Sequence, residues 1–315
     1  MRAVTNGAIA TLAVACVALP LFGSSYQIYL AELIFINIVA AIGLNLLTGN
    51  CGQISLCHAS LMAIGAYTTA LLTTRVGLTY AAALPAGTMV TTLLGASLGY
   101  PARRLSGLYL ALVTLGFLEV VSIAIEEFPE LTGGVRGLKL EQPELAGWPL
   151  SIGVLYYFVL GVTAFAIYAG WNIQRSRFGR AFNAVRQSVI VAQALAIPPE
   201  RTKLLAFCIA AAFAGLAGGL FTAVVGFIDP TEFDVSASLR QITFIAVGGL
   251  GSVLGSVVGA VVLTLLPEML RGAKEYSDVV YGAILLGTLV LAPKGIVGSL
   301  TLLSGWTGHP KARSS

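Results

Sequence analysis

The sequence carries little charge. Only 10% of its 315 residues are Asp, Glu, Lys or Arg, and 57% are hydrophobic, whereas soluble domains carry about 25% charged residues. This composition excludes a soluble globular protein. The only long polar stretch covers residues 172–203.

Histidine, cysteine and catalytic motifs are also scarce. The chain has two His and four Cys, too few histidines for a His-based metal site. Each Cys lies in or beside an apolar run, which predicts small packing residues rather than disulfides. No P-loop or His-Glu-x-x-His pattern occurs. We therefore expect no enzyme activity, no metal and no cofactor.

Long apolar runs are what the sequence does contain. A membrane-spanning helix needs about 20 mainly apolar residues, and continuous runs favour helices over a barrel, whose strands alternate. The sequence predicts an all-α, polytopic integral membrane bundle of about 8–10 membrane segments. We expect one domain over 1–300 and a tail over 301–315. The runs are 8–22, 27–47, 54–73, 79–99, 107–126, 150–171, 204–228, 239–266 and 277–292.

The run 239–266 is too short for two crossings. At about 1.5 Å per residue its 28 residues reach about 42 Å, whereas each crossing needs about 30 Å. Glycines interrupt it near its middle. We expect a broken, re-entrant pair of short helices.

Lys and Arg beside the runs predict the orientation. They put both termini and 172–203 inside, and 127–149 and 228–237 outside. The run 8–22 imitates a signal peptide, but no A-x-A-like cleavage site follows it, so we favour a retained helix.

Two glycine clusters, 48–53 and 248–252, fall where membrane helices are expected. Irregular backbone in a bilayer survives only when it is buried in protein or lines a wet cavity, and transporters bind substrate at such breaks. Close helix packing explains glycines equally well, so both interpretations stand. The candidate residues for a substrate path are Gly49, Gly52, Gln53, Ser55, His58, Glu119, Gly248, Gly249, Gly251 and Ser252.

Helical spacing places several of these residues toward the bundle. Ser55, His58, Met62, Gly65 and Thr69 recur every three or four residues, so we expect them on one inward face. An acid such as Glu119 in a membrane helix is costly and usually functional or paired. Glu32 is a weaker candidate.

The polar stretch 172–203 predicts a helix that lies flat. It holds six basic residues and one acid, and apolar residues recur at helical spacing until Pro198-Pro199 ends the pattern. Such a helix lies on the bilayer or in a partner's groove. The apolar positions are Phe178, Phe182, Val185, Val189 and Ala192.

Several blocks together resemble the permeases of branched-chain amino-acid ABC importers, the LivM-like type in particular. The likeness covers about 30–300. The blocks are 43–49, 52–59, 107–115, 132–138, 179–186, 192–196, 203–207, 214–219 and 248–252.

The resemblance implies a bacterial inner-membrane import permease for branched-chain amino acids or a related small polar solute. Its partners would be two cytoplasmic ABC ATPase subunits, a second related permease, a periplasmic or lipid-anchored solute-binding protein and membrane lipid, with no nucleic acid. A coupling helix over about 179–197 would dock on the ATPase, and the external loops would meet the binding protein. The implied coupling residues are Gly179, Arg180, Phe182, Val185, Arg186 and Ala196.

Two departures from the family pattern matter. Residues 187–190 replace an acidic stretch, so we expect Phe182, Val185 and the two arginines to carry the ATPase contact. Ala196 stands where a glycine is usual, and it would be strained if the backbone there needs a positive φ. Cys57 and Leu61 also replace the usual Gly and Phe.

Other functions stay open. The same machine in related permeases serves amides, urea, aromatic acids or nucleosides. An ion-coupled secondary transporter would instead use Glu119 and His58. The glycine breaks and Glu119 disfavour a membrane scaffold without transport.

Overall fold

The computed structural model describes residues 16–140, 144–145, 148–149, 151–269 and 287. Within them, five helices are long and apolar enough to cross a membrane. This confirms the polytopic helical bundle. The five are α2 (Ser25–Leu44, continued by the π-helix η1, Asn45–Asn50), α4 (Tyr80–Ala102), α5 (Gly107–Glu127), α7 (Ile152–Arg175) and α10 (Pro199–Val225).

Three further helices complete the described bundle. The helix α3 (His58–Thr74) has 17 residues, and α11 (Val235–Gly248) and α12 (Val253–Met269) are joined by a short break. The predicted run 277–292 and half of 8–22 lie outside the described residues. The predicted number of segments therefore stays a prediction.

The pair α11–α12 confirms the break predicted within 239–266. The two helices are bent by 119° at residues 249–252. Gly249 has φ 136° and Gly251 has φ 80°, a backbone conformation that residues with a Cβ rarely adopt. The glycines are therefore needed for the chain to turn here.

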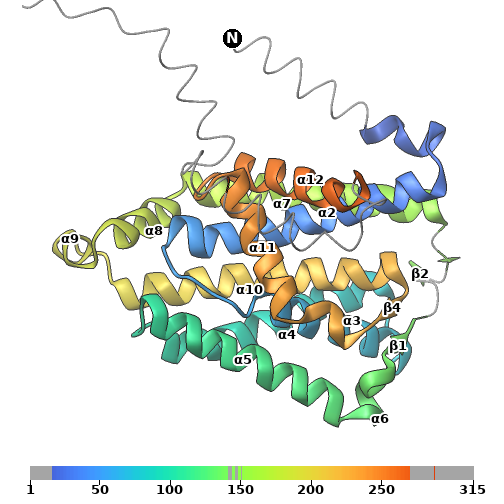
Figure 1. Ribbon diagram of the computed structural model, residues 1–315, viewed down its shortest axis with the longest axis horizontal. Coiled ribbons are helices and arrows are strands. Elements are labelled where there is room, and N and C mark those ends of the chain that lie inside the picture. Colours follow the sequence, from blue (N-terminus) through green and yellow to red (C-terminus); the bar gives the residue numbers. More distant parts are fainter. Residues whose placement is uncertain (1–15, 141–143, 146–147, 150, 270–286, 288–315) are drawn as a thin grey trace, which may run out of the picture.

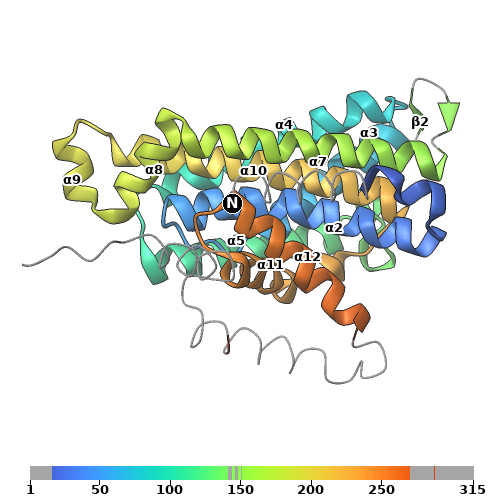
Figure 2. The ribbon, with the colours of Figure 1, turned by 90° about the horizontal axis from the view of Figure 1, so that it is seen from above.

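The helix α10 lies at the centre, against α2, α3 and α4 (Figures 1 and 2). Small residues allow this approach. A Cβ added to Gly218 would lie 2.0 Å from the carbonyl oxygen of Met62, and one added to Gly215 would lie 2.7 Å from Thr91 Cβ. Close backbone contact through small residues is a main source of helix association in membranes. The small residues of 211–219 thus serve packing.

The short elements gather at the two ends of the bundle (Figure 1). At one end α8 (Arg177–Gln187) and α9 (Val189–Ala194) project from α7 and α10, and we name this the α8–α9 end. At the opposite end, the η3 end, β1 pairs with β4 antiparallel, which joins the two loops predicted to share a side. The elements there are α6 (Pro129–Thr132), η2 (Gly134–Arg136), β1 (Leu138–Lys139), β2 (Glu144–Leu145), β3 (Trp148–Pro149), β4 (Phe227–Ile228) and η3 (Pro230–Phe233).

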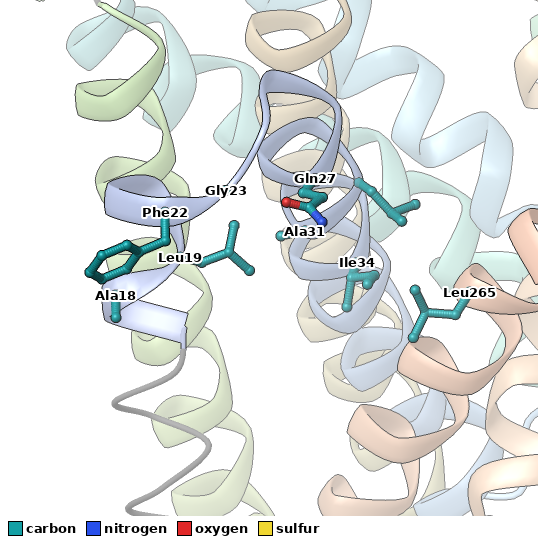
Figure 3. A pocket seen from close by; sticks show the side chains of 9 residues that line it. Ala18, Leu19, Phe22, Gly23, Gln27, Ala31, Ile34 and Leu265 are labelled. Carbon is teal, nitrogen blue, oxygen red and sulfur yellow. The ribbon is translucent and has the colours of Figure 1, made fainter.

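Residues 16–22 form a short helix against α7. The hydroxyl of Tyr156 donates to the Cys16 carbonyl at 2.6 Å, and that of Tyr157 donates to the Val17 carbonyl at 3.0 Å. A groove of about 470 Å³ separates this helix from α2 and Leu265 (Figure 3). Its walls are hydrocarbon apart from Gln27, whose amide oxygen accepts from the Ser24 N–H at the start of α2. The groove therefore does not suit a polar solute.

Packing at Gly218 predicts a position-specific loss of stability. Gly218→Ala should lower the free energy of unfolding by about 1–3 kcal/mol, because the methyl group would overlap the α3 backbone. Gly116→Ala is the control, since a Cβ on Gly116 in α5 meets nothing within 4 Å. Thermal unfolding in detergent measures both. Equal midpoints for the two variants would contradict the packing.

Candidate functional site

The two predicted glycine breaks meet each other at the α8–α9 end. Asn45 begins η1 and is buried against the turn between α11 and α12. Its Nδ2 donates to the carbonyls of Gly249 (3.2 Å) and Ser252 (2.9 Å) and to Ser256 Oγ (2.8 Å). Its Oδ1 accepts the Gly251 N–H at 2.7 Å. One amide therefore pairs with polar groups from both sides of the break.

Two more amides complete this contact. Asn50 Nδ2 donates to the Gly251 carbonyl at 3.4 Å, and Gln174 Nε2, from the end of α7, donates to the same oxygen. We name Asn45, Asn50, Gln174 and the turn 249–252 the Asn45 junction. Since unpaired backbone groups are costly away from water, the junction makes an irregular turn stable inside a membrane protein.

The junction leaves no room for a side chain at Gly49. A Cβ there would lie 1.8 Å from Asn45 Oδ1 and 2.4 Å from the Gly251 N. Gly248 is equally close to α12, since its Cβ would lie 1.9 Å from the Gly255 carbonyl oxygen. Five of the predicted path residues are thus packed together: Gly49, Gly248, Gly249, Gly251 and Ser252.

Arg186 ties α8 to the Asn45 junction. Its Nη1 donates to the Gly49 carbonyl, and a Cβ built on Gly251 would lie 3.2 Å from the same nitrogen. Gly52, at φ 73°, faces the aliphatic part of Arg186, with Cγ 3.0 Å from an added Cβ. The polar segment and both glycine breaks, predicted separately, therefore share one site.

Several residues between η1 and the start of α3 are buried beside the junction, among them Gln53, Ser55 and Cys57. Ser55 Oγ lies 3.2 Å from Cys57 Sγ, and His58 Nε2 donates to the Ala40 carbonyl at 3.0 Å. Their inward direction is as predicted, and Met62, Gly65 and Thr69 follow it. Their role in a substrate path, like that of the junction glycines, stays a prediction.

Glu119 stands apart from all of these residues. It is exposed on α5, whereas His58 is buried at the start of α3. The weaker candidate, Glu32, is the acid buried inside the bundle.

The segment predicted as a coupling helix over about 179–197 consists of two helices, because the chain breaks at Ser188. Ser188 has φ −163° and ψ 122°, and its Oγ accepts the Val191 N–H at 3.4 Å as the N-cap of α9. Serine competes for backbone hydrogen bonds and so favours helix starts. The family's acidic stretch is replaced here by residues that divide the segment into α8 and α9.

Phe182 and Val185, predicted to contact the ATPase, are covered by the same chain in this structure. Phe182 is 0% exposed, and it packs with Val185 and Ala192 on Leu47 and Phe207 of the same chain. These side chains anchor α8 and α9 to η1 and α10. An amphipathic pattern shows that a face is covered but not by which molecule, so sequence reasoning missed this.

Other apolar side chains of α8 and α9 face outward. Ile190 is 78% exposed and Leu195 is 66% exposed. Arg180 is exposed and donates to the Arg175 carbonyl at 3.1 Å, at the junction of α7 and α8. Gly179 allows the tight step between these helices, since its Cβ would lie 2.0 Å from the Gln174 carbonyl oxygen. The outward apolar residues are Phe178, Val189, Ile190, Val191 and Leu195.

Ala196, which stands where the family usually has glycine, has a positive φ. At φ 59° it is the only non-glycine residue with positive φ in the described part of the chain. The Ile197 N–H closes the end of α9 by donating to the Ala192 carbonyl at 2.9 Å. An L-residue in this conformation costs about 1–2 kcal/mol.

Comparison with known proteins identifies the fold's family. The family model for "Branched-chain amino acid transport system / permease component" matches residues 26–289. The chain belongs to this family. It is 34% identical to the high-affinity branched-chain amino acid permease protein LivM of Salmonella typhimurium, over 91% of this chain and 73% of that protein.

More distant relatives match shorter or weaker stretches. Permease protein LivH of Escherichia coli is 29% identical over 82% of this chain and 90% of its own length. The autoinducer 2 import permease LsrC of Klebsiella pneumoniae is 34% identical over 51% of this chain and 49% of its own. No solved structure matches the chain.

Membership settles several predictions. The family's members are permease subunits of ABC importers, which are not enzymes themselves, so the chain is a LivM-like, multi-pass inner-membrane permease. Membership also implies that the chain functions together with ATPase subunits and a second permease.

The Asn45 junction predicts a sharp effect of one substitution. Asn45→Ala should cost about 2–4 kcal/mol of unfolding free energy, because it leaves several buried groups unpaired, each worth about 1–3 kcal/mol. Amide hydrogen exchange should rise at residues 249–252 before it rises elsewhere. Asn183→Ala, at a half-buried position of α8, is the control. Unchanged exchange at the turn would argue against the junction.

The positive φ of Ala196 predicts that a substitution there will raise the stability of the chain. Ala196→Gly should stabilise the chain by about 1 kcal/mol, since glycine adopts positive φ without a Cβ clash. Ala194→Gly, within the last turn of α9, should do the opposite, because glycine weakens a helix. Thermal unfolding of the two variants gives the sign, and a fall in both would contradict a strained Ala196.

Proposed function

We propose that the chain is a LivM-like subunit of an ABC importer for branched-chain amino acids or a related small polar solute, and that α8 and α9 dock on its ATPase. The α8–α9 end then lies in the cytoplasm, as the Lys and Arg distribution predicts. Relatives named for this transport support the substrate class. One observation carries the docking: the apolar tip around Ile190 and Leu195, which is exposed at the far end of the bundle (Figure 1).

An exposed apolar cluster beside basic residues suits a protein groove. Isolated exposed apolar side chains need no explanation, but a contiguous group marks an interaction site. Arg177, Arg180 and Arg186 are exposed on α8, so an acidic rim around the ATPase groove would complement them. The groove would receive the tip, while Phe182 and Val185 hold the helices to the permease.

The contacts of α8 supply a route for mechanical coupling. A displacement of α8 by the ATPase would move Arg186 and, through the Gly49 carbonyl, η1. It would also move Leu47, which packs with Phe182. The Asn45 junction passes the displacement from η1 to the start of α12 and the end of α11. The two glycine breaks would thus act as the moving joint of the permease and line the path only when it opens.

The exposed face of α5 supports a position for the second permease. Most of this apolar helix is not covered by the rest of the described chain, since 22% of an 18-residue apolar stretch of it is buried. Glu119 lies near its middle. A carboxyl group that faces lipid is costly. We place the second permease, and the path between the two subunits, against this face of α5. The solute-binding protein would dock at the η3 end.

The alternative of an ion-coupled transporter finds less support. It requires Glu119 and His58 to act together, yet one is exposed on α5 and the other is buried and bonded to Ala40. A different solute within the same machine is consistent with the likeness to LsrC.

The docking hypothesis predicts a loss of coupling from a single surface change. Ile190→Asp should abolish co-purification of the ATPase subunits and lower ATP-driven leucine uptake in proteoliposomes by at least tenfold. A desolvated carboxylate in an apolar groove is strongly unfavourable. Val135→Asp is a matched control for ATPase co-purification, since Val135 is also 78% exposed but lies in η2 at the η3 end.

Two results would count against this proposal. Full ATPase binding by the Ile190 variant would place the dock elsewhere. Uptake by proteoliposomes that hold no ATPase subunit would favour ion coupling instead.

A further inference from the structure

A second cavity, of about 510 Å³, lies at the η3 end between α2, α3, α10, η3, α11 and α12. It differs from the apolar groove of Figure 3 because polar and apolar groups share its walls. Its size lies within the usual range of small-molecule sites, about 300–1,000 Å³. None of the predicted path residues lines it. The polar lining residues are Tyr29, Asn37, Glu232, Arg240, Gln241 and Thr264.

Gln241 lines this cavity from α11. The residue is only 6% exposed. Its Nε2 donates to Met62 Sδ at 2.8 Å, while its Oε1 is enclosed and has no hydrogen-bond partner among the described residues. Gln241 therefore adds a neutral polar side chain to the wall, and its oxygen does not open onto the cavity. Asn37, in contrast, is paired with Thr264 Oγ1 at 3.0 Å.

Two opposite charges flank the same cavity. Arg240 precedes Gln241 on α11, and Glu232 lies in η3. Both side chains are exposed, and neither forms an ion pair with another described residue; the ion pair found in that part of the chain joins Arg103 and Glu200. The cavity therefore offers a cation and an anion to one ligand.

The remaining wall is hydrocarbon. Ile36, Phe233, Phe244 and Leu263 come from four elements and are all buried. They form a surface that an aliphatic side chain can cover. The walls thus match the two parts of an apolar amino acid: a zwitterionic head and a branched tail.

We propose that this cavity binds a free α-amino acid with an aliphatic side chain. Arg240 pairs with its carboxylate, Glu232 accepts from its ammonium group, and the side chain packs on Ile36 and Phe244. That the bound amino acid is the transported one rests on the proposed function. The binding itself rests on the cavity alone.

The helix α11 gives this site a connection to the rest of the protein. Arg240 and Gln241 lie in its first half, and Gly248 ends it at the Asn45 junction. A ligand that draws Arg240 and Glu232 together changes the position of α11 relative to η3. The same rigid helix then carries the change to the turn that Asn45 holds.

Photolabelling tests the site without relying on transport. The complete importer in lipid nanodiscs is irradiated with L-photo-leucine, a diazirine analogue, and the labelled residues are mapped by mass spectrometry. Labels should fall within 29–37, 232–244 and 263–267. Excess L-leucine should compete, whereas 4-methylpentanoate, which lacks the ammonium group, and L-leucinamide, which lacks the carboxylate, should not.

Variants assign the parts of the ligand. Arg240→Gln and Glu232→Gln should each reduce competed labelling at least tenfold, and Arg240→Lys should keep part of it. Arg136→Gln removes the same charge from an exposed position of η2 at the same end, and it should leave labelling unchanged.

The outcomes separate this inference from the proposed function. ATP-driven leucine uptake without competed labelling of the cavity would overturn the site and leave the importer standing. Competed labelling without uptake would support the site and overturn leucine import. Labels confined to the groove of Figure 3 would show apolar partition only and would overturn the site.

Discussion

The hydrogen bonds of Asn45 hold together parts of the chain that would otherwise separate. The end of α2 and the turn between α11 and α12 meet at this one amide, and the end of α8 joins them through the bond from Arg186 to the Gly49 carbonyl. An irregular turn inside a membrane protein needs partners for every backbone group. Without Asn45 the 119° bend would expose such groups to hydrocarbon, and α11 would lose its fixed end.

The two sides of the α8–α9 segment have different roles. Phe182, Val185 and Ala192 face the bundle, while Ile190 and Leu195 face away. The inner side makes the segment part of the permease, and the outer side is left for a partner. A docking element needs both, because a surface helix that is not anchored could be displaced without moving anything else.

Much of this architecture could be predicted from the sequence, for physical reasons. Long apolar runs predicted the helices, and run length against bilayer thickness predicted the break in 239–266. The inward stripe from Ser55 to Thr69 followed from helical periodicity. A glycine position occupied by Ala196 pointed to positive φ. These features depend on local spacing, which the sequence displays directly.

Other features depend on which segments meet in space, and the sequence could not predict them. Asn45 was visible only as one polar residue in an apolar run, and its partners are more than 200 positions away. The same holds for the cavity at the η3 end, where Gln241 follows an arginine that gave no signal by itself. The sequence did not predict that Phe182 packs inside the same chain, because an apolar stripe on a helix does not show which surface covers it.

The chemistry of the Asn45 junction has a consequence for how the protein responds to its surroundings. Its bonds join neutral amides, a serine hydroxyl and backbone groups. Mobile ions screen exposed charges but hardly affect buried dipoles. Ionic strength should therefore act on the mouth of the cavity, where Glu232 and Arg240 meet water, and leave the inner joint unaffected. Added salt would change the affinity of the cavity for solute, but not the coupling between the cavity and the Asn45 junction.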